Sequence, residues 1–228
     1  MDSHLVLIAL HLLGFAFGVG GATASDAIFV RSVKDGKVTR SEYNILKTVS
    51  IIVWTSVTIL ILSGTLLMLL ELQQGGDIPR LGFSFFQLKL TAFALLVANG
   101  VVFHFRVFPL LKSTIGQSFR EEGVRHKYWL FALTGGISIV SWYTAFLAVA
   151  FSSVLIDYPY LFLLNIYGLL ICGAALSAYL VLHSFAMERG LVWTLSTIYR
   201  HPFVVKMVLV GLLLVSGLLA QGYELFLT

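Results

Sequence analysis

Five ionisable side chains that lie within apolar stretches are the residues of this sequence most able to do chemistry. They are His11, Asp26, Lys89, His104 and His183. Inside a bilayer such groups are costly to expose to lipid, so they normally face the interior of a helix bundle and serve a function. Imidazole, carboxylate and ammonium groups ligate metals, carry protons or pair with charged ligands.

The residue types leave three uses of the buried histidines open. Neutral imidazole is an axial ligand of b-type haem, which needs no covalent attachment. Imidazole also suits copper, and His and Asp in series can form a proton or ion path. The structural alternative is that these side chains only join helices through polar contacts.

Cysteine usage excludes several other kinds of site. The sequence has no Cys-x-x-Cys-His motif, which excludes a c-type haem. The single cysteine, Cys172, excludes an internal disulfide, a Cys-x-x-Cys redox pair and a cysteine-based zinc site. Because it lies within an apolar helix, we expect Cys172 to be a small core residue.

The first apolar stretch, residues 5–29, has one side that is small and polar. Small residues allow another helix, or a flat ligand, to approach the backbone closely. We therefore expect this side to face the bundle and the remaining Leu, Val, Ile and Phe side chains to face lipid. At 100° per residue, the residues that share this side are His4, His11, Gly14, Gly18, Ala22 and Ser25, with Asp26 at its edge.

The spacing of the ionisable residues predicts two polar levels. His11 and Asp26 are fifteen residues apart, and so are Lys89 and His104 in a helix that crosses in the same direction. At a rise of 1.5 Å per residue, the His11–Lys89 level lies about 22 Å from the Asp26–His104 level. We expect Asp26 to accept a hydrogen bond from His104 or to pair with Arg31. Lys89 either extends toward the interface or pairs with a carboxylate such as a haem propionate beside His11.

Composition indicates that membrane helices position these residues. The chain is 58% hydrophobic and 11% charged, whereas soluble proteins have about 25% charged residues. We predict an all-α integral membrane protein with a single transmembrane domain, residues 1–228, made of a four-helix core (5–150) and two additional helices (160–226). Each helix meets the requirement of ~20 residues for crossing a bilayer. The six predicted spans are 5–29, 46–70, 84–107, 128–150, 160–187 and 203–226.

Charge is distributed unevenly between the connections. Thirteen of the fifteen Lys and Arg residues flank the first, third and fifth connections, and only Arg80 and Lys89 lie toward the other side. The positive-inside rule then places these three connections in the cytoplasm and both termini outside. This topology accounts for the pI near 9.2, so we expect no nucleic-acid partner. The N-terminal residues lack the basic region of a cleavable signal peptide, so we expect the first helix to remain in the mature protein.

The first connection has two interpretations. Asp35 to Glu42 resembles the second half of an EF-hand loop, but Arg31 occupies a position where that loop needs a carboxylate. We favour a turn at Asp35-Gly36, followed by a capping box of Thr39 and Glu42 that begins the second helix.

Other polar and aromatic residues could support a site. Asn99 lies midway along the third span, and Asn165 lies on a stripe of the fifth. Tyr143 lies in the outer half of the fourth span, where it could equally be an interfacial aromatic residue. His126 and His201 lie in basic connections, where we expect them to be solvated or to face lipid headgroups.

Several short motifs lie between about residues 5 and 110. They are His11 in HLLGFAFGVGG, Asp26, Phe29 and Arg31 in an Asp-x-x-Phe-x-Arg stretch, Trp54 in helix two, and QLKL with Lys89 and a later histidine, His104, in helix three. These motifs resemble the small bacterial membrane protoporphyrinogen oxidases of the HemJ type and the related CopD-like copper-resistance membrane domains. The resemblance implies that His11 takes part in haem binding and that Lys89 is needed for activity, and it does not extend to the last two helices.

Together these features predict a multi-pass protein of the bacterial cytoplasmic membrane that binds haem b, with copper as the alternative. We expect His11 to ligate the haem; His104 and His183, which lie at one level, could instead hold a haem near the cytoplasmic face. The expected activity is electron transfer or porphyrin oxidation, with Lys89 as the catalytic group and a porphyrin or a quinone as partner.

Two other classes of function remain open from the sequence. One is a transporter or ion-conducting protein, for a metal or for protons, that uses the same polar levels. The other is a structural subunit of a larger membrane complex. Membrane lipid is an expected partner in every case, and a homo-oligomer is compatible with each.

Overall fold

The computed structural model describes residues 3–73, 82–187 and 201–227, and these residues are almost entirely helical. Six of their helical segments are long and apolar enough to cross a membrane. The chain is therefore an all-α, multi-pass membrane protein, as predicted. Its elements are α1 (Ser3–Lys34), α2 (Arg40–Gln73), α3 (Ser84–Val102), η2 (Phe103–Val107), α4 (Phe108–Ser113), α5 (Glu122–Arg125), α6 (Tyr128–Ala150), α7 (Ser152–Leu155), α8 (Tyr160–Met187) and α10 (Pro202–Leu227).

The predicted spans match these helices closely. The spans predicted at 128–150 and 160–187 coincide with α6 and α8. The differences lie at one end of the bundle, where α1 continues to Lys34, α2 begins at Arg40 and the third span continues to Ser113. Apolar length marks the part of a helix within the bilayer, whereas these additional turns carry charges and need not lie in it.

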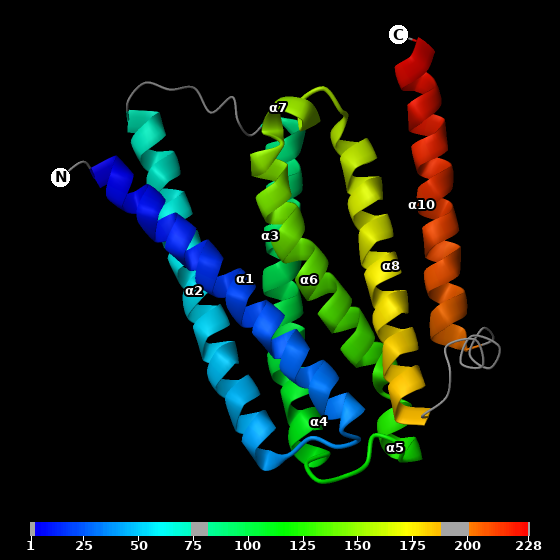
Figure 1. Ribbon diagram of the computed structural model, residues 1–228. Coiled ribbons are helices and arrows are strands. Elements are labelled where there is room, and N and C mark those ends of the chain that lie inside the picture. The colour runs from blue at the N-terminus through cyan, green and yellow to red at the C-terminus, as the bar shows by residue number, and fades with distance from the viewer. Residues whose placement is uncertain (1–2, 74–81, 188–200, 228) are drawn as a thin grey trace.

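The helices form two groups that lie side by side. α1 packs along α2, whereas α6 packs against both α3 and α8, and α10 packs on α8 (Figure 1). The beginning of α1 and the end of α10 lie at one end of the molecule, at the top of Figure 1. The α1–α2 connection, α4 and α5 lie at the opposite end. We call this the basic end, because its connecting segments carry Lys37, Lys112, Arg120 and Arg125.

The two groups meet closely toward the basic end and separate toward the other end. The upper ends of α1 and α2 diverge from α3 and α6 (Figure 1). Although α2 and α3 are consecutive spans, they make little contact with each other. The α1–α2 pair instead contacts the rest of the bundle mainly through α1, which packs against α6 and α8.

Two glycines of different helices permit the closest approaches between neighbours. A Cβ on Gly136 of α6 would lie 2.8 Å from the backbone nitrogen of Ala175 in α8. A Cβ on Gly18 of α1 would lie 2.2 Å from the Trp142 ring of α6. Small residues at such contacts are the usual means by which membrane helices pack closely.

Two connecting loops close the basic end through backbone hydrogen bonds. The amide of Gly116 donates to the carbonyl of Val38, and the amide of Phe119 donates to the carbonyl of Gly36, both at 2.9 Å. Gly36 and Gly116 have φ of 82° and 79°, a region that favours glycine. The predicted turn at Asp35-Gly36 is therefore present.

The predicted capping box at the start of α2 is also confirmed. The Thr39 hydroxyl and the Thr39 amide donate to the Glu42 carboxylate at 2.7 and 2.8 Å, and the Glu42 amide donates to the Thr39 hydroxyl at 3.2 Å. This reciprocal pairing satisfies backbone donors that the first helical turn leaves without partners.

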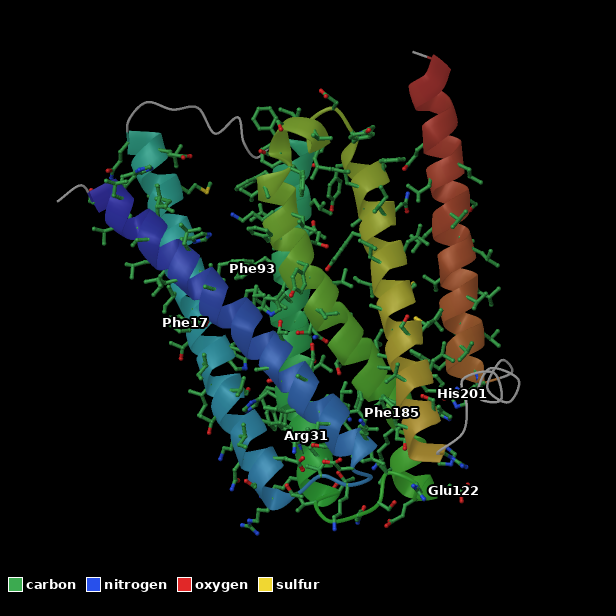
Figure 2. The ribbon with its side chains drawn as sticks, in the orientation of Figure 1. Phe17, Arg31, Phe93, Glu122, Phe185 and His201 are labelled. Carbon is green, nitrogen blue, oxygen red and sulfur yellow. The ribbon has the colours of Figure 1, made fainter. Side chains whose placement is uncertain are left out.

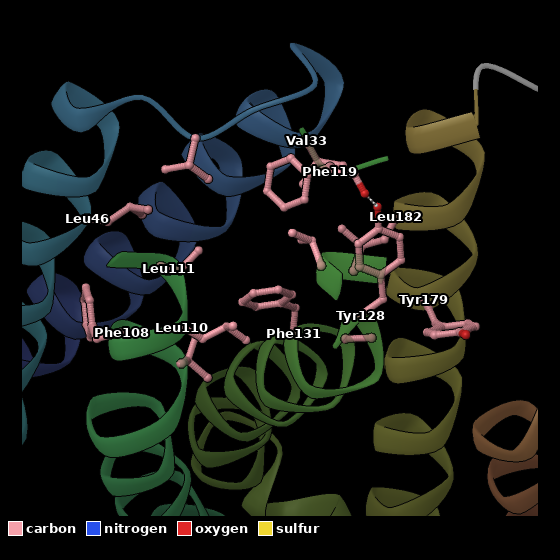
Figure 3. Close-up of a cluster of buried hydrophobic side chains, with 14 of the residues drawn as sticks. Val33, Leu46, Phe108, Leu110, Leu111, Phe119, Tyr128, Phe131, Tyr179 and Leu182 are labelled. Atoms are coloured by element: carbon pink, nitrogen blue, oxygen red, sulfur yellow. Dashed lines mark hydrogen bonds between the residues drawn. The ribbon is translucent and has the colours of Figure 1, made fainter. Parts of the chain in front are cut away.

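A buried apolar cluster lies beneath these loops (Figure 3). Its side chains come from α1, α2, η2, α4, α6, α8 and α10 and from the loop between α4 and α6. The Tyr128 hydroxyl of α6 donates to the carbonyl of Phe119, which fixes the loop over the cluster. This end of the bundle is thus a continuous packed core.

The third span contains one turn of π-helix, η2, just before Pro109. The Phe108 amide bonds to the carbonyl of Phe103, five residues earlier. Proline has no amide hydrogen, and its ring would clash with the carbonyl of Phe105 in a regular helix. The wider turn relieves that clash and rotates the residues around it relative to a continuous α-helix.

Candidate functional site

The small and polar side of α1 faces the bundle, as its periodicity predicted. Gly14, Gly18 and Ala22 are buried, and His11 lies on the same side. The His11 Nδ1 lies 2.9 Å from the hydroxyl oxygen of Ser63 in α2. Ser63 was not identified from the sequence as a partner, because its position opposite His11 depends on how α1 and α2 pack.

The Ser63 hydroxyl determines the tautomer of His11. This hydroxyl has one hydrogen, which it donates to the carbonyl of Ile59 at 2.6 Å. Its oxygen therefore accepts the hydrogen bond from His11, and the His11 Nδ1 carries the proton. In the neutral ring, Nε2 then presents a lone pair.

Lys89 lies on α3, across from His11. Its ammonium is close enough to act electrostatically on the His11 ring. It also lies 5.9 Å from the centre of the Phe86 ring, a cation–π distance. His11 and Lys89 are therefore near one another, as their shared level predicted.

Asp26 borders a cavity of about 90 Å³ between the α1–α2 pair and the α3–α6 pair. Cavities of this kind hold water at roughly 10–15 Å³ per molecule, so several water molecules fit. The remaining walls are mostly leucine and valine side chains. The residues with polar atoms around the cavity are Ser25, Asp26, Ser50, Trp54, Asn99, Ser138 and Trp142.

Glycines on two helices shape this cavity. A Cβ on Gly135 of α6 would lie 4.0 Å from the carboxylate of Asp26, so the carboxylate lies against bare backbone. A Cβ on Gly100 of α3 would lie 3.2 Å from the Trp54 ring, which packs over that glycine. Asn99 is buried, and its side-chain amide donates to the carbonyl of Thr134 at 2.9 Å.

The expected partners of Asp26 do not contact it. Arg31 pairs with Asp35 at 3.8 Å at the exposed basic end, where Figure 2 labels it. Arg31 is in the last turn of α1 and Asp35 is in the turn that follows it, whereas Asp26 lies on the face of α1 turned into the cavity. Among the described residues, Asp26 has no hydrogen-bond or ion-pair partner.

His104 lies on η2 and is exposed, and it forms no hydrogen bond with Asp26. Its ring packs on those of Phe105 and Phe108, with centroids 5.2 and 6.4 Å away. The π-turn alters the register here, and Val107 is buried instead.

His183 belongs to a second cluster near the basic end, away from the cavity. Its ring lies against those of Tyr179 and Tyr128, with centroids 4.7 and 5.2 Å away. The ring centroid of His201, which Figure 2 labels, lies 6.5 Å from that of His183. The Tyr179 hydroxyl and His183 Nδ1 are buried and have no hydrogen-bond partner among the residues that the structure describes. His183 and His104 thus do not face one another.

His201 was expected to be solvated, but it packs on this cluster. Its ring centroid lies 5.2 Å from that of Tyr179, and its Nδ1 accepts a hydrogen bond from the Phe203 amide at 3.3 Å. Burial, together with neighbouring His126, lowers the pKa of His201 below its usual value of 6.5. The sequence did not indicate this contact, because it joins the start of α10 to α8.

Three further residues lie elsewhere in the bundle. The Asn165 side chain donates to Gln221 at 3.1 Å and so joins α8 to α10. Tyr143 is 43% exposed and points away from the cavity-lining face of α6, as an interfacial aromatic would. Cys172 is buried, as expected of a core residue.

Within the part of the chain that the structure describes, no group of three or more His, Cys, Asp or Glu could hold a metal ion. Compared with models of known protein families, with curated proteins and with solved structures, the chain has no significant match. The resemblance to the HemJ type therefore remains a prediction from short motifs.

Proposed function

We propose that this protein is a haem b-binding protein of the bacterial cytoplasmic membrane that acts in electron transfer or porphyrin oxidation. The observation that carries the proposal is the orientation of His11. Ser63 accepts from Nδ1 and leaves the Nε2 lone pair available to a metal. A hydrogen bond that fixes the other ring nitrogen is the usual support of a metal-bound histidine.

The donor set fits haem better than a bare copper ion. Haem brings four nitrogen ligands of its own, so one imidazole suffices to hold its iron. Copper held by protein ligands alone needs several side chains together, and the described residues offer no such group. When bound, haem would supply one-electron redox chemistry at the outer level of the bundle.

Lys89 fits a positioning role in this proposal. Its ammonium lies near His11, and a cation there would pair with a propionate and fix the orientation of the porphyrin. The upper ends of α1 and α2 diverge from α3 at this level (Figure 1).

The test is the visible absorption spectrum of the detergent-purified protein, oxidised and then reduced with dithionite. We expect a Soret band and sharp reduced α and β bands. His11→Ala should abolish them, whereas His126→Ala should not, because His126 is exposed and lies 3.5 Å from the Glu122 carboxylate in the connection at the basic end. A colourless protein, purified from cells with ample haem, would contradict the proposal.

The cavity around Asp26 favours a second candidate, a transport or ion-conducting function. A carboxylate in a cavity with room for water between helix pairs is typical of ion and proton pathways. This candidate predicts flux across proteoliposomes that Asp26→Asn removes while any haem spectrum is retained.

A further inference from the structure

We propose that the cavity around Asp26 binds a small organic ammonium ion, with its charge beside the Asp26 carboxylate and its apolar groups against Trp54 and Trp142. This site is distinct from the His11 level, because His11, Ser63 and Lys89 do not line the cavity. The inference therefore holds whether or not His11 binds haem.

The charge of the residues around the cavity is the first reason to expect a cationic ligand. No Lys, Arg or His lines the cavity, and Asp26 has no ion-pair or hydrogen-bond partner among the described residues. A carboxylate within a membrane is costly unless it is paired. A cationic ligand supplies the missing charge, and an anion would be repelled.

The aromatic walls are the second reason, and they favour an organic cation over a metal ion. Trp54 comes from α2 and Trp142 from α6, so indole rings line the cavity from both helix pairs. Tryptophan is the aromatic residue that binds ammonium groups best through its ring face. The other walls are chiefly Leu and Val, which suit methyl groups better than a hydrated ion.

Hydrogen-bonding groups around the cavity are the third reason. Ser50 and Ser138 bring hydroxyls to the same space. A ligand that carries a hydroxyl or carbonyl beside its ammonium group would satisfy such donors.

Size limits the ligand. The cavity of about 90 Å³ lies between packed helices, and Gly100 and Gly135 contribute no side chain to its walls. We therefore expect a compact ion with a few carbon atoms and not a bulky polyaromatic cation.

The test compares two probes of the same shape. Binding of choline and of its uncharged isostere 3,3-dimethylbutan-1-ol would be measured by calorimetry on the full chain in dodecyl maltoside, a detergent without ammonium groups. We expect choline to bind and the isostere to bind at least tenfold more weakly, the factor that losing an interaction with a charged group gives. Equal binding of the two probes by the unaltered protein would overturn the proposal.

Matched variants locate the site. Asp26→Asn should weaken choline binding about tenfold or more, whereas Asp35→Asn, in the exposed turn that follows the same helix, should not. Trp54→Phe should weaken it severalfold, whereas Trp129→Phe, at a position 43% exposed, should not. Unchanged binding in both Asp26→Asn and Trp54→Phe would place choline elsewhere and overturn the assignment. Displacement of choline by an equal concentration of sodium would overturn it in favour of an inorganic cation.

Discussion

His11 and Asp26 lie on one helix and point to the same interior, yet they have different surroundings. His11 has a hydroxyl partner on α2 that determines which nitrogen carries its proton. Asp26 has no partner among the described residues and borders a cavity. The first arrangement suits a ligand that needs a fixed lone pair, and the second suits a ligand that brings a positive charge.

Ser63 offers a direct test of the His11 orientation. If His11 ligates haem, Ser63→Ala removes the acceptor for Nδ1 and should weaken haem affinity by about 10- to 100-fold. Haem titration of the apoprotein measures this change. Thr58→Ala is the matched control, because its hydroxyl makes the same kind of backbone bond on α2 from an exposed position. An equal loss of haem affinity in both variants would indicate that the substitutions act by altering the structure of α2, and would contradict the role of Ser63.

His201 predicts a pH dependence of stability. Its pKa is lowered in the folded protein, so the unfolded chain binds a proton more readily. The stabilisation is then fully present above the unfolded pKa of about 6.5 and is lost as the pH falls toward the folded pKa. Thermal unfolding in detergent should show a lower Tm at pH 5 than at pH 8, and His201→Gln should reduce that difference. A variant with an unchanged pH profile would contradict this role.

The helices themselves were largely predictable, but their local irregularities were not. Apolar stretches indicated all six spans, and α6 and α8 match in both bounds. The π-turn at Phe103–Val107 followed from no periodicity, although Pro109 was a visible signal for it. The exposure of His104 has a simpler cause: the buried positions Leu96 and Asn99 are followed at helical spacing by Phe103, which lines the cavity, so His104 falls outside that face.

The close packing of α1 on α6 predicts that alanine substitutions at two glycines of α1 affect stability differently. Gly18→Ala would place a Cβ 2.2 Å from the Trp142 ring and should destabilise the protein by about 1–3 kcal/mol through overpacking. Gly20→Ala has nothing within 4 Å and should be neutral or stabilising by up to about 1 kcal/mol. Thermal unfolding should therefore give a clearly lower Tm for Gly18→Ala than for Gly20→Ala. Equal values would show that Trp142 repacks freely.

The arrangement of the bundle places the chemistry at two levels of one interface. The α1–α2 pair and the α3–α6 pair hold the Asp26 cavity between them, and the His11–Lys89 pair lies farther from the basic end. The continuous core of the basic end holds these pairs together, whereas their other ends diverge (Figure 1).

Orientation in the membrane can be tested with introduced cysteines in a Cys172→Ala background. Ser113 and Ser153 are exposed and lie at opposite ends of the bundle. The positive-inside rule predicts that a membrane-impermeant maleimide labels Ser153→Cys in intact cells and Ser113→Cys only after permeabilisation. The reverse pattern would place the basic end outside.

The sequence by itself determined the class of protein, the six helices, the inward face of α1 and the capping box at Thr39. These follow from apolar length, helical period and short-range chemistry, which act within one helix or one turn. Only the tertiary structure decided that His11 forms a hydrogen bond with Ser63, that Asp26 borders a cavity and that the His183 ring lies near that of His201. These contacts join separate segments of the chain. They depend on how each helix is rotated about its axis and on how closely the helices pack at glycines, and the residue pattern of a single helix specifies neither.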